Sequence, residues 1–71
     1  MQQHTSTTAH ALVQVGSLWI DRAHHHRLVE VIQLPDEHHV RLRPIRHSHY
    51  QPPSYIEPTA RLGTDYERVR P

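Results

Sequence analysis

The chain contains no cysteine, lysine, asparagine or phenylalanine among its 71 residues. Without cysteine, disulfide bonds and thiolate zinc sites cannot support the fold, and thiol chemistry is excluded. A chain of this length forms at most one domain and buries only about 60% of the surface that its unfolded form exposes. We therefore expect a marginal core that is supported by a protein partner or by self-association as a homo-oligomer.

Long apolar runs are also missing, because the longest, such as residues 18–20, have three residues or fewer. A membrane-spanning helix needs about 20 apolar residues, and a secretory signal peptide needs an apolar region of about 7–15. We therefore expect a soluble, cytoplasmic protein that makes no contact with membranes.

The excess of positive charge is small, with a formal net charge of +1 when histidine is neutral. A dedicated non-specific DNA-binding protein would carry a clear basic excess, because binding depends on neutralising phosphates. All eight cations are arginine, and histidine occurs nine times. A coding sequence rich in G and C favours both residue types, which points to a high-GC bacterium or one of its phages.

The first ten residues are polar and have no period, so we expect a flexible N-terminal tail over residues 1–10. A single domain is expected over residues 11–71. Val13 and Val15 alternate before a break at Gly16, which indicates a short strand or an extended arm.

Residues 27–45 predict two strands joined by a tight turn. Val29 and Val31 share one face of the first strand, because successive side chains of a strand point to opposite sides. Pro35, followed by two acidic residues, is typical of a type I turn. In the second strand the alternation places Val40 and Leu42 inward, and it places the intervening arginines outward.

The remaining segments are shorter. Trp19 is expected in the core of the sheet. We expect further strands near residues 17–21, 55–58 and 64–69, a loop around Pro52 and Pro53, and one helical turn ended by Gly63. The sum is an all-β domain: a small SH3-like, partly open barrel of four to five short antiparallel strands, with a one-turn helix before the last strand.

The order Gly-x-x-Trp-x-Asp, Val-x-Val, Val-x-Leu and Leu-x-x-x-Tyr-x-x-Val resembles small SH3-like β-barrel proteins of phages and high-GC bacteria. The positions that carry the resemblance are Gly16, Trp19, Asp21, Val29, Val31, Val40, Leu42, Leu62, Tyr66 and Val69. The resemblance covers roughly residues 13–70. It implies the fold and a phage or mobile-element origin, and it supplies no active residues.

Histidines offer one possible chemistry. His24 and His26 are two residues apart, as are His47 and His49, so each pair would point to one side of an extended chain. Two such pairs could converge on a tetrahedral zinc, nickel or copper ion. Because the spacings match no standard zinc finger, solvated loop histidines are the favoured explanation, and we expect no cofactor.

Catalysis is not expected, so we predict that the protein is not an enzyme. Gly16 and Gly63 are the only glycines, which leaves no glycine-rich phosphate loop. The carboxylates are scattered singly or lie in the Asp36–Glu37 pair, and a domain this small rarely encloses a substrate pocket.

The outward arginines and the tyrosines beside the proline pair form the candidate binding surface. Its predicted residues are Arg41, Arg43, Arg46, Tyr50 and Tyr55. We expect a non-enzymatic interaction module that binds a host or phage protein, or a second copy of itself, through the hairpin and this aromatic loop. The alternative is nucleic-acid binding by Arg41, Arg43 and Arg46 with bases stacked on aromatic rings, and metal binding by histidine is a third hypothesis. Ordinary cross-strand pairing of the arginines with Glu30, Asp36 and Glu37 would explain the same pattern without a ligand.

Overall fold

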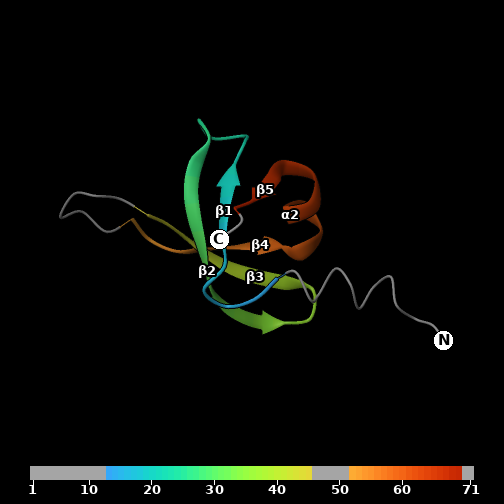
Figure 1. Ribbon diagram of the computed structural model, residues 1–71. Helices are drawn as coiled ribbons and strands as arrows, with labels where there is room; N and C mark the ends of the chain where they lie inside the picture. The colour runs from blue at the N-terminus through green and yellow to red at the C-terminus, as the bar shows by residue number, and fades with distance from the viewer. Residues whose placement is uncertain (1–12, 46–51, 70–71) are drawn as a thin grey trace.

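The computed structural model describes residues 13–45 and 52–69 (Figure 1). In this part of the chain five antiparallel strands form one sheet in the order β4-β3-β2-β1-β5, with a short helix before the last strand. The elements are β1 (Leu18–Asp21), β2 (Arg27–Asp36), β3 (His39–Pro44), β4 (Tyr55–Pro58), α2 (Thr59–Asp65) and β5 (Tyr66–Arg68). The predicted fold class is confirmed. The strands do not close into a ring, which agrees with a partly open barrel. The tail expected over residues 1–10 lies outside the described residues.

The β2–β3 hairpin provides the centre of the sheet, and its inner face is the one that the sequence predicts. Val29, Val31, Val40 and Leu42 are completely buried. The turn lies further along the chain than predicted, because β2 continues through Pro35 to Asp36. Register shifts follow Val31 and again precede Asp36, and such bulges accommodate a proline that cannot donate to the ladder.

The core forms on the inner face of this sheet. Its buried apolar residues are Val13, Trp19, Val29, Val31, Val40, Leu42, Leu62 and Tyr66. Trp19 is 5% exposed, which confirms its predicted place in the core. Its indole N–H donates to Ser17 Oγ at 3.0 Å, so the polar atom of this large side chain is satisfied inside the protein.

The segment before β1 was expected to be a short strand or an extended arm; residues 13–14 belong to no strand, and residues 15–16 form a turn. Gly16 has a φ of +93°, a value that glycine adopts without steric cost, so the predicted break is confirmed. The Gly16 N–H donates to Val31 O at 2.7 Å, and Val31 N–H donates to Ser17 O at 3.0 Å. These bonds hold the turn against β2 and place Val13 in the core, whereas Val15 is exposed.

Helix α2 leads from the edge strand β4 to the other edge strand, β5, and packs beside both (Figure 1). It has seven residues and passes through Gly63 to Asp65, so the glycine does not end it as predicted. Leu62 is its buried residue and joins the core, while Thr59 N–H donates to His38 O at 2.8 Å. No helix in residues 13–45 and 52–69 is long and apolar enough to cross a bilayer.

Candidate functional site

The side of the sheet that points away from the core carries aliphatic side chains. Residues directly opposite each other in neighbouring strands share a face, and Ile20 lies opposite Leu28, while Arg41 lies opposite Ile56. Ile45 continues the row of Leu28, because its N–H donates to Leu28 O at 2.9 Å. We call this side the outer face; its residues are Leu18, Ile20, Leu28, Glu30, Gln33, Arg41, Arg43, Ile45, Ile56 and Glu67.

These aliphatic residues are not a second core. Ile56 is 44% exposed and Ile45 is 37% exposed. Leu18, Ile20 and Leu28 are partly exposed as well. A sheet that already buries its core on one side therefore presents an apolar surface on the other, interrupted by charged residues of both signs.

The two described arginines of the predicted surface both lie on the outer face, but their charges are satisfied differently. Arg43 Nη2 lies 3.9 Å from Glu30 Oε1, which is the cross-strand pair expected from the sequence. Arg41 donates to two neutral groups, Gln33 Oε1 at 3.0 Å and Ser54 Oγ at 3.2 Å. No carboxylate in the described part of the chain pairs with Arg41, so its charge is uncompensated on this face.

The acidic residues of the turn pair with neither Arg41 nor Arg43, the two arginines of the surface that lie in the described ranges. Asp36 Oδ1 accepts from His39 Nδ1 at 2.9 Å, and Glu37 lies 3.9 Å from His38 Nε2. The alternative in which Asp36 and Glu37 neutralise the arginines is therefore not what the structure has.

Tyr55 lies on the inner side and does not share a surface with Arg41 and Arg43. It is opposite the buried Leu42 and packs against the core. Its hydroxyl lies 2.9 Å from the Tyr66 hydroxyl, and the Arg27 guanidinium lies over its ring at 5.3 Å. Arg46 and Tyr50, the other residues predicted for the surface, lie outside the described residues.

The tyrosine pair belongs to a polar network that links β4 to β5. The Tyr66 hydroxyl donates to Glu57 Oε2 at 2.8 Å, and Arg61 Nη1 lies 3.9 Å from the other Glu57 oxygen. Burial, together with the hydrogen bonds to Tyr55 and Glu57, raises the pKa of Tyr66 far above its ordinary value. A phenol that keeps its proton serves as a hydrogen-bond donor between strands and not as a nucleophile.

Asp21 is a buried residue whose role the sequence did not indicate. Its side chain is completely buried at the end of β1 and accepts hydrogen bonds from Ala23 N–H at 3.1 Å and Arg27 Nε at 3.2 Å. Ala23 bonds Oδ1, whereas Arg27 bonds Oδ2, and His24 Nδ1 lies 2.8 Å from the same Oδ2. An aspartate just before a polar connection is the local signal for such a turn, because its carboxylate can accept from the backbone two residues on.

The same turn changes the geometry of the predicted metal ligands. The same-side argument for His24 and His26 requires an extended chain, whereas residues 22–26 form a turn in which His25 and His26 have φ values of 59° and 57°. No group of three histidine, aspartate or glutamate residues that could hold a metal ion occurs in the described ranges. His47 and His49 lie outside these ranges, so the site with four histidines stays a prediction. The extended chain that this prediction assumes is not present at His24 and His26.

A comparison of the chain with protein families, with curated proteins and with solved structures finds no match. The resemblance to SH3-like proteins of phages and high-GC bacteria therefore stays a prediction. The candidate site is defined by its own geometry alone, as an apolar outer face with one uncompensated arginine.

Proposed function

We propose that this protein is a non-enzymatic interaction module that binds another protein through its outer face. The observation that carries the proposal is the aliphatic side of the sheet opposite the core, on which Ile45 and Ile56 are well exposed. Exposed apolar surface bordered by polar residues is characteristic of protein–protein interfaces, and arginine is enriched in them.

The charges of the outer face support a partner that is apolar and carries a carboxylate. Arg41 lies opposite Ile56 and has only neutral hydrogen-bond partners in the described part of the chain. A carboxylate can accept two parallel hydrogen bonds from a guanidinium, which makes arginine well suited to anchor such a contact. The partner surface would therefore place an acidic side chain over Arg41 and aliphatic groups over Ile56.

Nucleic-acid binding by Arg41, Arg43 and Arg46 has less support from the geometry. Stacking of bases needs exposed aromatic rings beside the arginines. The tryptophan and both tyrosines in the described residues, Trp19, Tyr55 and Tyr66, belong to the core or pack against it. The cytoplasmic location, the phage or mobile-element origin and the identity of the partner as a host or phage protein are predictions from the sequence.

Site-specific photo-crosslinking tests the proposal. A benzoylphenylalanine at position 56 would lie on the outer face, and the same probe at position 15 is the control, because Val15 is also exposed but lies in the turn before β1. We expect the probe at position 56, and not at position 15, to capture a protein in cells of the source organism. The captured protein is then identified by mass spectrometry and produced in pure form.

Affinity for the purified partner provides the decisive measurement. Arg41→Gln should weaken binding about 10- to 100-fold, because a charge-assisted hydrogen bond contributes about 1.5–3 kcal/mol. Arg22→Gln is the matched control, since Arg22 is exposed and donates to Thr64 O on another part of the surface. Unchanged affinity of Arg41→Gln, capture of a second copy of this chain alone, or capture of nucleic acid would each overturn the proposal.

A further inference from the structure

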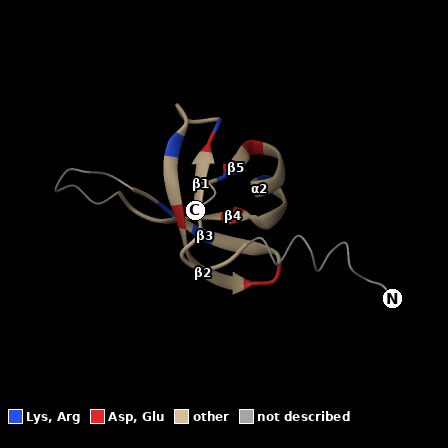
Figure 2. Ribbon diagram, in the orientation of Figure 1, with Lys and Arg blue, Asp and Glu red and all other residues tan. Residues whose placement is uncertain are grey.

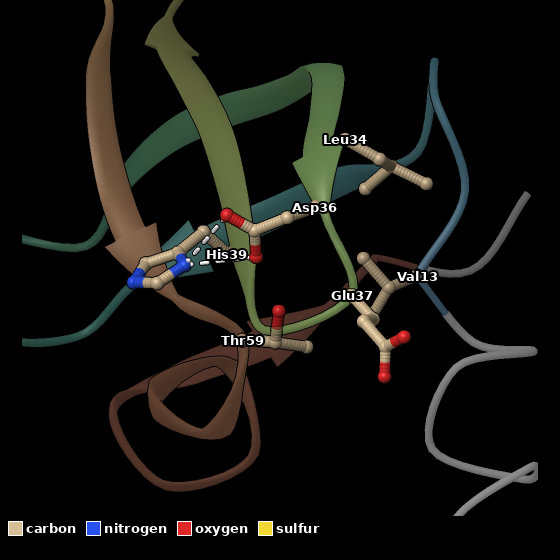
Figure 3. Close-up of a pocket in the computed structure, with 6 residues that line it drawn as sticks. All are labelled: Val13, Leu34, Asp36, Glu37, His39 and Thr59. Carbon is tan, nitrogen blue, oxygen red and sulfur yellow. Dashed lines mark hydrogen bonds and ion pairs between the residues drawn. The ribbon is translucent and has the colours of Figure 1, made fainter.

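A small pocket lies at the tip of the β2–β3 hairpin, apart from the outer face. Figure 3 shows the residues around it, which come from the segment before β1, the end of β2, the turn and the start of β3 and α2. Its volume is about 90 Å³, and its lining residues are Val13, Leu34, Asp36, Glu37, His39 and Thr59. Clefts for drug-sized ligands are typically about 300–1,000 Å³, so this pocket has room for a single side chain.

One wall of the pocket is apolar and accessible. The Val13 and Leu34 side chains lie beside each other on this wall (Figure 3). Val13 is nearly buried, whereas Leu34 is 44% exposed although it is a large aliphatic residue. An unbranched hydrocarbon chain could therefore lie against both residues and remove apolar surface from water.

The pocket is also lined by two acidic residues, Asp36 and Glu37, which lie where β2 passes into the turn that Figure 2 colours red. The Asp36 carboxylate accepts from His39 Nδ1 and from His38 N–H, and these hydrogen bonds hold the pKa of Asp36 below its ordinary value. Glu37 accepts no hydrogen bond from any residue in the described part of the chain, and its side chain is 77% exposed. Two carboxylates thus line the pocket together with the two aliphatic side chains, and the Glu37 carboxylate has room to accept a new donor.

We infer that this pocket binds a lysine side chain of a partner polypeptide, with its methylene chain against Val13 and Leu34 and its ammonium group at Glu37 and Asp36. An anion would be repelled by the two carboxylates, and a purely apolar side chain would give Glu37 no hydrogen-bond donor. Both Asp36 oxygens already face His39 Nδ1, at 2.9 and 3.1 Å, which disfavours the two-point grip that arginine makes. The chain itself contains no lysine, so this ligand would come from a different protein.

Titration of the full chain with lysine analogues, followed by nuclear magnetic resonance, tests this site without any identified partner. The probe is N-acetyl-lysine-N-methylamide, and the comparison probes are the norleucine and arginine derivatives. We expect saturable shifts of the Val13 and Leu34 methyl groups and of the Glu37 and Thr59 amides. The norleucine derivative should bind about fivefold more weakly, which corresponds to the contribution of a partly exposed charge contact.

Charge-neutral variants separate the pocket from general attraction to an acidic surface. Glu37→Gln should weaken lysine binding by about the same fivefold factor, while Glu67→Gln on β5, also exposed, should leave it unchanged. The exposure of Glu37 means that its replacement should not disturb folding. The proposal is overturned if no shift saturates, if norleucine binds as tightly as lysine, if arginine binds more tightly, or if Glu37→Gln has no effect.

Discussion

Replacing Asp21 with asparagine removes the negative charge from a carboxylate that is completely buried at the end of β1. The side chain keeps its shape, and its remaining oxygen can still accept from Ala23 N–H. The amide NH2 group takes the place of Oδ2 and cannot accept a hydrogen bond, so the bond from Arg27 Nε at 3.2 Å is lost, and the contact with His24 Nδ1 at 2.8 Å loses its negative charge. We expect this one substitution to be among the most destabilising isosteric changes in the protein.

The magnitude follows from the exposure of the two side chains that contact this carboxylate. A hydrogen bond to a charged group contributes about 1.5–3 kcal/mol, and a cation left buried without its partner adds a further penalty. The side chains of His24 and Arg27 are 61% and 39% exposed, so both reach water when the carboxylate is lost. The low end of the range therefore applies to each contact, and we expect a total loss of about 2–3 kcal/mol. A domain of this size has about 4–11 kcal/mol of stability, so the variant should melt about 10–20 °C lower.

Urea and thermal denaturation followed by Trp19 fluorescence measure this loss directly. The chain has a single tryptophan, and it is buried in the same core. Asp65→Asn is the matched control, because Asp65 bonds Arg61 in an exposed i, i+4 pair worth about 0.3–0.5 kcal/mol. If Asp21→Asn were as stable as Asp65→Asn, the argument that the buried carboxylate holds the turn at residues 22–26 would be refuted.

Two further predictions concern the polar network and the histidine turn. Folding stability should fall as the pH rises above about 10, because an unfolded tyrosine then ionises while the raised pKa of Tyr66 keeps its phenol protonated in the folded state. Tyr66→Phe should lower the free energy of unfolding by about 1 kcal/mol at neutral pH. In urea denaturation above about pH 10, the stability of this variant should fall less steeply than that of the unmodified protein, and an equally steep fall in both would contradict this reasoning. His26→Gly should be about 0.5–1 kcal/mol more stable, because glycine adopts the φ of 57° without steric cost. Ala23→Gly is the control, because Ala23 lies in the same turn but does not have a positive φ. This variant should not be more stable than the unmodified protein, and an increase in its stability would contradict the argument from φ.

The alternation of apolar and polar residues in the two hairpin strands was sufficient to predict which residues form the inner face. Val29, Val31, Val40 and Leu42 are buried because the period of two in a strand depends only on local geometry. The position of the turn was not predictable in the same way. Pro35 signals a turn locally, but the bulges in β2 let the strand continue past it while pairing with β3. Gly63 lies inside α2 for a similar reason, since the packing of Leu62 supports the helix beyond the glycine.

The candidate site could be predicted only in part. Arg41 and Arg43 point outward as the alternation indicates, and this is again a local property. The side taken by Tyr55 depends on its register opposite Leu42, which a strand of four residues does not reveal by itself. Asp21 is similar, because its burial depends on contacts that the turn at residues 22–26 and Arg27 bring back to it.

The pairing of β5 with β1 has a consequence for how the protein is made. Trp19 lies opposite Arg68, so one side of β1 finds its hydrogen-bonding neighbour only after the ribosome has synthesised almost all of the described chain. Until then a nascent polypeptide can form the β2–β3 hairpin, but it exposes an open strand edge that carries Leu18 and Ile20. Chains released before Tyr66 would therefore be prone to aggregate through that edge, and rapid completion of translation would protect against it.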